Sequence, residues 1–212
     1  MKSPLPRLLL ITDRTLCADL PVTIAAALAG GVRHVLLREK GLPEASLLRL
    51  AQELQGVTAA QGAFLLIHER VDLALAIGAH GVHLPEHGLA TAEARRLLAG
   101  LPAALLGRSC HSVAGACQAL QEGADFVTLS PLFATLSHPD APPLGVNRFA
   151  AMRASIPGPV LALGGIHREN ARTAMQTGAY GIALIRGVLD TPDPCQTAAA
   201  LLREISQGED AL

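Results

Sequence analysis

Residues 64–85 read FLLIHERVDLALAIGAHGVHLP, and this stretch decides the fold. It starts with an apolar run of strand length, Phe64–His68, continues with an Ala- and Leu-rich segment of helix length, and ends with a second short apolar run, Gly81–Pro85. Gly78 lies between the helix and the second run, where a left-handed residue commonly closes a helix. The stretch therefore predicts a strand, a helix and a second strand.

The same alternation of strand and helix continues in both directions along the chain. A helix that ends in glycine followed by a small apolar residue recurs at Ala29–Val32, Glu122–Ala124 and Thr177–Ala179. The remaining predicted strands are Leu8–Thr12, His34–Glu39, Leu105–Cys110, Phe126–Ser130, Pro159–Gly164 and Gly181–Ile185. Eight apolar strands joined by helical crossovers favour a closed parallel barrel, so the predicted fold class is α/β, a single (β/α)8 TIM barrel domain over residues 1–212. An open flavodoxin-like or Rossmann sheet is the weaker alternative, because no G-x-G-x-x-G follows the first strand.

Composition excludes several classes of partner. The formal net charge is −1 and half of the residues are apolar, so we expect neither nucleic acid nor an anionic membrane as a partner. No apolar stretch is long enough to cross a bilayer and the first residues lack a signal-peptide core, so we expect a cytoplasmic location. The four cysteines are far apart, without metal-site or disulfide spacing, and are interpreted as buried or incidental thiols.

Charged residues are scarce in this chain, yet they gather where the predicted strands end. In a closed parallel barrel the chemistry lies at these carboxyl ends. Arg38 and Lys40 alternate at the end of the second strand, so both side chains can point into the barrel mouth. A guanidinium and an ammonium group there suit a phosphate or a diphosphate.

The last two strands end in loops of another kind. Gly164 and Gly165 lead into a helix that is predicted to begin near Arg168, and Ile185, Arg186 and Gly187 lead into a further helical turn. Small residues let a ligand approach the backbone, and the first N–H groups of a helix are free to bind an anion. These loops predict a phosphate-binding cup, as is common after strands seven and eight of such barrels.

The eight histidines do not form a recognisable metal motif. His34 and His80 precede or begin strands at the opposite end of the barrel and are interpreted as structural. Six others follow or end strands and can face the mouth, namely His68, His83, His87, His111, His138 and His167. A lone histidine is more often a hydrogen-bonded structural residue than a ligand, and no H-E-x-x-H spacing supports zinc.

In their order along the whole chain, several phrases resemble the thiamine-phosphate synthase/TenI family. They are LLLITDR near the start, LLREKG at 36–41, HERVDLALAIGAHGVHLPE from His68, GRSCHS at 107–112, GADFVTLSPLFAT at 123–135, PPLG at 142–145, VLALGGIHREN at 160–170 and GAYGIALIRGV at 178–188. The resemblance implies thiamine biosynthesis by a transferase that joins a pyrimidine methyl diphosphate to a thiazole phosphate and releases diphosphate.

The resemblance also implies roles for particular residues. Those implied in catalysis are Arg38, Lys40, Glu69, Ser109 and His138. Those implied in substrate binding are His68, His83, His111, Thr135, Ser137, Gly164, Gly165, Ile185 and Arg186. A synthase would use Mg²⁺, for which Glu69 is the candidate ligand and Glu86 a shifted second one.

The match is uneven on the side of the pyrimidine, the diphosphate and the metal. Leu36 stands where the family has glutamine, and His68-Glu69 replaces Asn-Asp. Gly88 replaces a usual metal carboxylate, and Thr135-Leu136-Ser137-His138 replaces T-x-T-K. The thiazole-phosphate side keeps its residue types.

Two other functions stay open for this reason. One is a TenI-like thiazole tautomerase, which needs no diphosphate and no Mg²⁺. Its pattern has a histidine where this chain has Pro131, so His111, His138 or His83 would have to move the proton. The other is a protein that binds thiazole phosphate without turnover. In each case the partner is a small phosphate-bearing molecule, and the sequence gives no oligomeric state.

Overall fold

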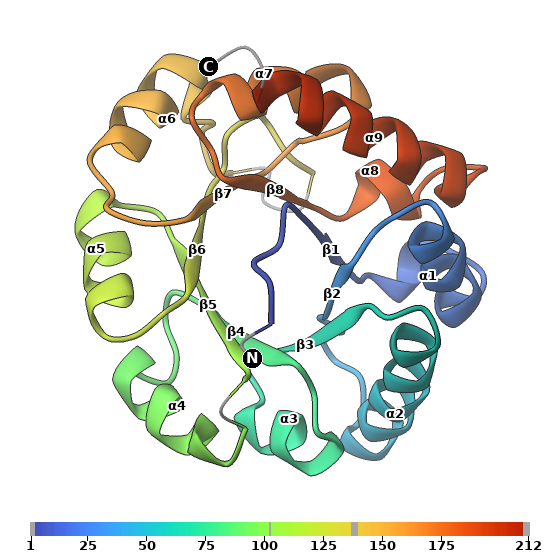
Figure 1. Ribbon diagram of the computed structural model, residues 1–212. Coiled ribbons are helices and arrows are strands. Elements are labelled where there is room, and N and C mark those ends of the chain that lie inside the picture. Colours follow the sequence, from blue (N-terminus) through green and yellow to red (C-terminus); the bar gives the residue numbers. More distant parts are fainter. Residues whose placement is uncertain (1–2, 102, 137–139, 210–212) are drawn as a thin grey trace.

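The computed structural model describes residues 3–101, 103–136 and 140–209 of the chain, and its core is a closed barrel of eight parallel strands (Figure 1). Each strand pairs with the next in sequence, and β8 pairs with β1 to close the ring. The strands are β1 Leu8–Ile11, β2 His34–Leu37, β3 Phe64–His68, β4 Gly81–Leu84, β5 Leu105–Cys110, β6 Phe126–Leu129, β7 Val160–Leu163 and β8 Gly181–Leu184. The predicted (β/α)8 barrel is confirmed.

Strands β3 and β5 have the predicted bounds, whereas the other six end one or two residues before the predicted carboxyl end. At these points the chain leaves the sheet and forms the loops of the mouth. Residues just beyond the strands still form hydrogen bonds with the neighbouring strand end. The N–H of Thr12 donates to Leu36 O at 2.9 Å, and the N–H of Arg38 donates to the Thr12 hydroxyl at 2.9 Å. These bonds fix the start of the second loop against the first.

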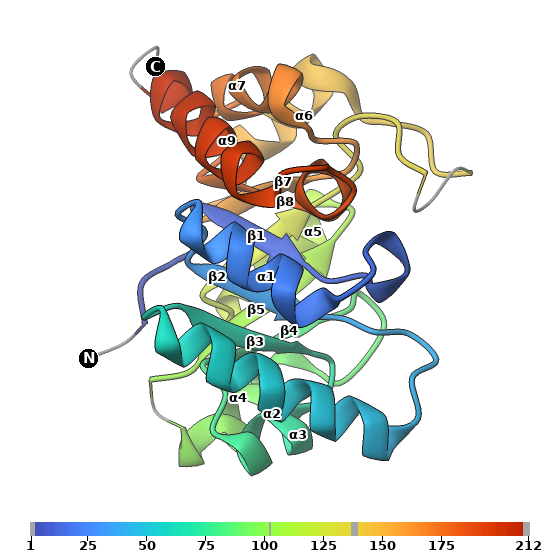
Figure 2. The same cartoon turned by 90° about the vertical axis from the view of Figure 1, so that its right-hand side faces the viewer.

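Helices surround the barrel, as Figures 1 and 2 show. They are α1 Leu20–Ala29, α2 Glu44–Ala60, α3 Val71–Ile77, α4 Thr91–Leu97, α5 Val113–Gln121, α6 Gly145–Ala154, α7 Arg168–Gln176, α8 Arg186–Leu189 and α9 Pro194–Glu209, with short 3-10 turns at Arg14–Leu16 and Leu98–Gly100. Helix α9 packs against α7 and α1 and so covers the place where β8 meets β1. In the described part of the chain, no helix has the length and apolar character needed to span a membrane.

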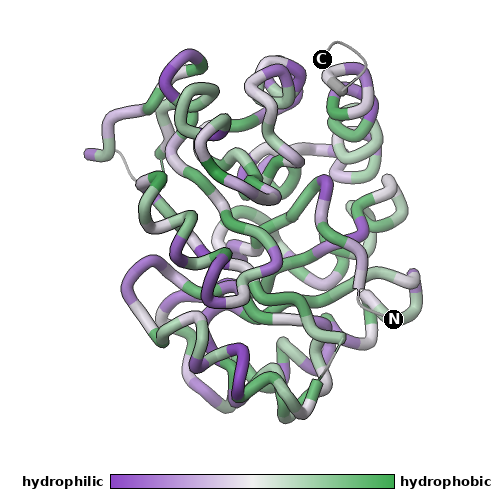
Figure 3. Tube along the Cα trace, turned by 60° about the vertical axis from the view of Figure 1, so that its left-hand side comes forward, coloured by the Kyte–Doolittle hydropathy of each residue, from purple (hydrophilic) through white to green (hydrophobic). Residues whose placement is uncertain are grey.

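The side chains of the barrel alternate between two apolar cores. In β4, Val82 and Leu84 point outward and belong to the core between sheet and helices, so His83 points inward. Apolar residues of the other strands fill the barrel interior, namely Leu9, Ile11, Leu36, Leu66, Leu105, Phe126, Leu161 and Ala183. Figure 3 shows the strands as mainly hydrophobic, with hydrophilic segments on the outer helices and loops.

The two histidines predicted to be structural lie away from the mouth, and the cysteines form no disulfide. His34 Nε2 bonds Pro4 O at 2.9 Å, and the N–H of Leu65 donates to His80 Nδ1 at 3.2 Å, both at the amino ends of strands. The cysteines are free, and burial raises the pKa of the Cys110 thiol to about 12. The structure thus supports the interpretation of His34 and His80 as structural.

Candidate active site

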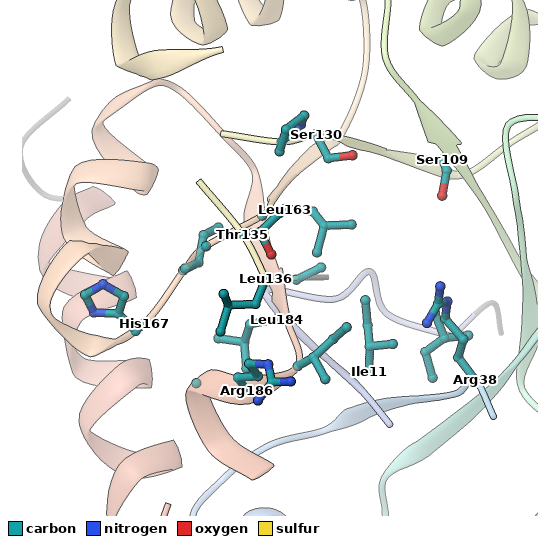
Figure 4. Close-up of a pocket in the computed structure, with 18 of the residues that line it drawn as sticks. Ile11, Arg38, Ser109, Ser130, Thr135, Leu136, Leu163, His167, Leu184 and Arg186 are labelled. Atoms are coloured by element: carbon teal, nitrogen blue, oxygen red, sulfur yellow. The ribbon is translucent and has the colours of Figure 1, made fainter. Parts of the chain in front are cut away.

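A cavity of about 1610 Å³ opens at the carboxyl ends of the strands (Figure 4). Its lining brings together most of the residues that the sequence singles out, namely Arg38, Lys40, His68, Glu69, His83, Ser109, His111, Thr135, Gly164, Gly165, Ile185 and Arg186. The predicted residues Ser137 and His138 lie outside the described residues. The volume exceeds the range of about 300–1,000 Å³ usual for one small ligand, so the cavity has room for more than one such molecule.

Strand alternation explains why these residues meet. Leu36 and Leu66 point into the barrel, and Arg38 and His68 each lie two residues further along the same strand direction, so they face the same way. Ser109 lies on the inward face of β5. In Figure 4, Arg38 and Ser109 lie on one side of the cavity, and Thr135, His167 and Arg186 lie on the other. The mouth therefore has two polar sides that face each other.

The cationic side begins at the end of β2. Burial lowers the pKa of Arg38, and the carboxylates of Asp13 and Glu39 oppose this shift. An arginine stays charged even so, because its reference pKa is above 12. The Glu39 side chain is itself buried and accepts bonds from the backbone N–H and the guanidinium of Arg14. Arg38 and the more exposed Lys40 thus present fixed positive charge to the cavity.

Two neutral histidines lie beside this charge. Burial lowers the pKa of His68 to about 4 and that of His83 to about 3, and nearby cations, Arg38 among them, add to both shifts. Their rings stack with centroids 6.5 Å apart. His83 Nε2 lies 3.4 Å from the Thr128 hydroxyl, while His83 Nδ1 is buried without a hydrogen-bond partner among the described residues. The pair is uncharged at neutral pH and offers polar ring atoms to a ligand.

Glu69 has an unusual backbone conformation at the end of β3. Its φ is +64°, the left-handed region that side-chain-bearing residues rarely adopt. The Glu69 N–H donates to His83 O at 2.9 Å, and its carbonyl accepts from the N–H of Val71 at 3.1 Å, so both neighbours hold this conformation. Such local strain often accompanies a functional position. It places the Glu69 carboxylate at the cavity wall.

The loop after β4 is held by the strand after it. The Arg108 guanidinium donates to Glu86 O at 2.9 Å and to Leu89 O at 2.8 Å. The Glu86 carboxylate accepts from the backbone N–H of His111 at 3.3 Å, and its other oxygen lies 3.8 Å from His111 Nε2 and 3.6 Å from His87 Nε2. Glu86 thus faces histidines, a pairing that the sequence did not predict.

The loops after β7 and β8 form the other side of the cavity. Gly164 and Gly165 have φ of +106° and +62°, and α7 begins at Arg168 as predicted. A Cβ on Gly165 would lie 2.9 Å from Phe133 Cβ, so glycine is required for this close approach. Asn170 locks the turn, because its amide donates to Gly165 O at 2.9 Å and accepts from the N–H of His167 at 2.8 Å.

Arg186 begins the short helix α8 on the same side. Its guanidinium donates to Asp190 at 3.2 Å, one helical turn on. This pair fixes the arginine beside the cavity, where both partners contribute to the lining. The predicted helical turn after the last strand is confirmed.

The apolar residues that line the middle of the cavity were not predicted from the sequence. Figure 4 shows four apolar side chains between the two polar sides, namely Ile11, Leu163, Leu184 and Leu136. Leu136 is exposed over 77% of its surface although it lines the cavity. The period-two pattern of the strands could have identified Ile11 and Leu163, because both continue the inward face. The cavity therefore offers an apolar middle to a flat ligand.

Comparison with known proteins identifies the family. The sequence model of the family described as thiamine monophosphate synthase matches residues 8–188. The chain belongs to this family. A thiamine-phosphate synthase of Methanoculleus marisnigri is 39% identical, over 94% of this chain and 95% of its own, and a Geobacter sulfurreducens protein named "Putative thiamine-phosphate synthase" is 48% identical, over 92% of each chain. The solved structure of a thiamine phosphate pyrophosphorylase from Pyrococcus furiosus superposes with a TM-score of 0.86 at 30% identity, covering 95% of this chain and 96% of that one.

The resemblance to the thiamine-phosphate synthase/TenI family implies that a synthase uses Mg²⁺. Mg²⁺ prefers oxygen ligands in octahedral geometry, often one or two carboxylates with substrate phosphates. Among the residues that the structure describes, no three His, Cys, Asp or Glu side chains gather as metal ligands. Glu86 faces His111 and His87, and Gly88 has no side chain, although a Cβ there would lie 4.0 Å from Glu69 Oε1. Of the two carboxylate positions that the resemblance implies for Mg²⁺, the chain keeps a carboxylate at Glu69 and has none at Gly88, so a bound Mg²⁺ would take its remaining ligands from substrate phosphates and water.

Proposed function

We propose that this chain is a thiamine-phosphate synthase, which joins a pyrimidine methyl diphosphate to a thiazole phosphate and releases diphosphate. The observation that carries the proposal is one cavity with two opposed sides that suit anions: cationic side chains after β2, and glycines with helix starts after β7 and β8. Two anionic substrates that react with each other need such an arrangement. Family membership and relatives named as synthases support it.

Arg38 and Lys40 bind the diphosphate of the pyrimidine substrate. As the carbon–oxygen bond breaks, negative charge grows on the departing diphosphate, and fixed cations stabilise that charge more than they stabilise the bound substrate. Ser109, on the inward face of β5, adds a hydroxyl donor on the same side of the cavity. These residues lower the barrier by charge that is in place before the reaction.

The cup of Gly164, Gly165, Ile185 and Arg186 binds the phosphate of the thiazole. The glycines let the phosphate approach the backbone, and the start of α7 supplies N–H groups without partners inside the helix. Thr135 adds a hydroxyl from the loop after β6, on the same side of the cavity. An anchored phosphate places the thiazole ring over the apolar middle, where its nitrogen can face the pyrimidine carbon.

The neutral His68 and His83 recognise the edge of the pyrimidine ring. An aminopyrimidine presents alternating donors and acceptors, and His83 Nδ1 is a buried ring nitrogen that needs such a partner. Glu69 supplies a carboxylate that accepts from an amino group. Because both histidines stay uncharged, they bind the ring without repelling the positive charge that develops on its methylene carbon.

The experiment that tests the proposal combines the purified protein with both substrates, with and without Mg²⁺. We expect thiamine phosphate and diphosphate in equal amounts. Arg38→Gln should lower kcat/KM for the pyrimidine diphosphate by about 100-fold, the scale of a lost transition-state charge contact. Arg70→Gln is the matched control, because Arg70 pairs with Asp72 and Glu44 outside the cavity lining.

Two results would contradict the synthase assignment. Isomerisation of a thiazole tautomer without coupling would indicate a tautomerase. Tight binding of thiazole phosphate with no conversion in the presence of both substrates would indicate a binding protein.

A further inference from the structure

His111 and Glu86 form a side-chain pair at the rim of the cavity, between the ends of β4, β5 and β6. Glu86 follows β4, and His111 directly follows β5. The Glu86 carboxylate accepts the backbone N–H of His111 at 3.3 Å and lies 3.8 Å from His111 Nε2 with its other oxygen. Both residues line the cavity, and the His111 side chain is half exposed. The pair is therefore built and accessible to a ligand.

The hydrogen bonds of His111 decide which ring atom exchanges a proton. Nδ1 lies 2.8 Å from Ser130 O. A carbonyl oxygen only accepts, so Nδ1 carries the hydrogen in this contact, and Nε2 is the atom that gains or loses a proton. Nε2 faces Glu86 at a distance beyond a direct hydrogen bond, which leaves it able to reach a ligand.

The departing diphosphate needs a partner on this rim. Gly88 leaves one usual metal position without a carboxylate, and no three His, Cys, Asp or Glu side chains of the described residues gather as metal ligands. Arg38 and Lys40 hold the diphosphate from the β2 side, and His111 lines the same cavity two residues beyond Ser109. A proton donated from His111 would neutralise charge that the side chains after β2 leave uncompensated.

We propose that His111 is the general acid that protonates the leaving diphosphate, with Glu86 as its positioning residue. This rests on the proposed synthase function. The carbon–oxygen bond of the pyrimidine methyl diphosphate breaks, and both of its electrons go to the diphosphate oxygen. The thiazole nitrogen supplies the electron pair of the new carbon–nitrogen bond. The proton of His111 Nε2 passes to a diphosphate oxygen, and solvent returns a proton to the ring after release.

The test varies the basicity of the leaving group. Pyrimidine methyl esters of methylene bisphosphonate, diphosphate and difluoromethylene bisphosphonate have similar shapes and leaving groups of decreasing basicity. An acid catalyst helps a basic leaving group most. His111→Gln should therefore lower kcat by about 100-fold for diphosphate, more for the methylene compound and least for the difluoromethylene compound. Equal losses for all three esters would overturn the acid role and indicate a structural one.

His87→Gln is the matched control, because His87 also faces Glu86, at 3.6 Å, but its side chain is 93% exposed. We expect it to keep the wild-type rates for all three esters. A His87→Gln variant with the losses expected of His111→Gln would overturn the assignment of the acid to His111.

Glu86 is tested by coupling to His111. Glu86→Gln should increase the dependence of kcat on leaving-group basicity in the wild-type background and add almost nothing in the His111→Gln background, because residues that act as a unit are not additive. Additive losses would overturn its positioning role. If the wild-type protein forms no thiamine phosphate at all, the proposed function itself fails; if it does and His111→Gln shows no change in that dependence, only the acid proposal fails.

Discussion

Acid should unfold this protein through its buried histidines. Burial lowers the pKa of His34 to about 4, of His68 to about 4 and of His83 to about 3. In the unfolded chain each has a pKa of about 6.5. Below that value the unfolded state binds more protons than the folded state, so stability is full above pH 6.5 and is lost as the pH falls toward the folded pKa values.

The size of the effect follows from the same shifts. Between pH 7 and pH 5 an unfolded histidine takes up about 0.7 proton while its folded counterpart takes up almost none, which costs about 2 kcal/mol per histidine. The three together remove about 6 kcal/mol, a large part of the about 5–15 kcal/mol that stabilises a typical domain. The Asp13 and Asp72 carboxyls do not contribute in this window, because their pKa values are lowered from 3.8.

Urea unfolding at half-unit steps from pH 7 to pH 5 measures this directly. The free energy of unfolding should fall with a slope that corresponds to nearly three protons near pH 5.5 from these residues, and His80 adds to it because burial lowers its pKa too. His34→Gln removes one of them at the end of the barrel remote from the cavity and should reduce the slope by about one proton. His87→Gln, on an exposed side chain, should leave it unchanged. A free energy of unfolding that is constant within about 1 kcal/mol over this range would refute the reasoning.

Two further substitutions test the two sides of the cavity. Gly165→Ala should lower the free energy of unfolding by about 2–4 kcal/mol and weaken thiazole-phosphate binding in calorimetry, because a methyl group there meets Phe133. Gly62→Ala is the control, since Gly62 has nearly the same left-handed φ as Gly165, +61° against +62°, but open space around it. A loss of stability in Gly62→Ala equal to that in Gly165→Ala would contradict the packing argument. Gly88→Asp should place a second carboxylate near Glu69 and tighten Mg²⁺ binding in the presence of diphosphate by about tenfold, whereas Gly88→Asn should do less. Unchanged Mg²⁺ affinity in both variants would show that position 88 does not face a metal site.

The order of the elements and the inward-pointing residues followed from the sequence, because both depend on local periodicity. The predicted ends of β3 and β5 were correct, and glycines such as Gly78 and Gly123 adopt the positive φ expected at helix ends. Periodicity also places Arg38 at the mouth. The other predicted strands extended one or two residues too far at their carboxyl ends, because the polarity of a residue does not show where the chain leaves the hydrogen-bonded sheet.

The contacts between loops could not be predicted in this way. Glu86 and His111 are separated by 25 residues, and they meet because Arg108 bonds the backbone after β4 from the outer face of β5. The left-handed φ of Glu69 has no sequence signal, because glutamate rarely adopts it. Such features depend on the relative heights of neighbouring loops, which only the closed barrel determines.

The two sides of the cavity differ in how mutation can change them. The charge after β2 is carried by the side chains of Arg38 and Lys40, and a single nucleotide change in either codon can remove it. The cup after β7 and β8 is built largely from backbone groups, and every amino acid except proline supplies the same N–H. With the site proposed above, descendants of this chain can therefore lose or replace the leaving-group chemistry in few steps while they keep the capacity to hold a phosphate ester. New reactions on the barrel would begin from an already anchored substrate.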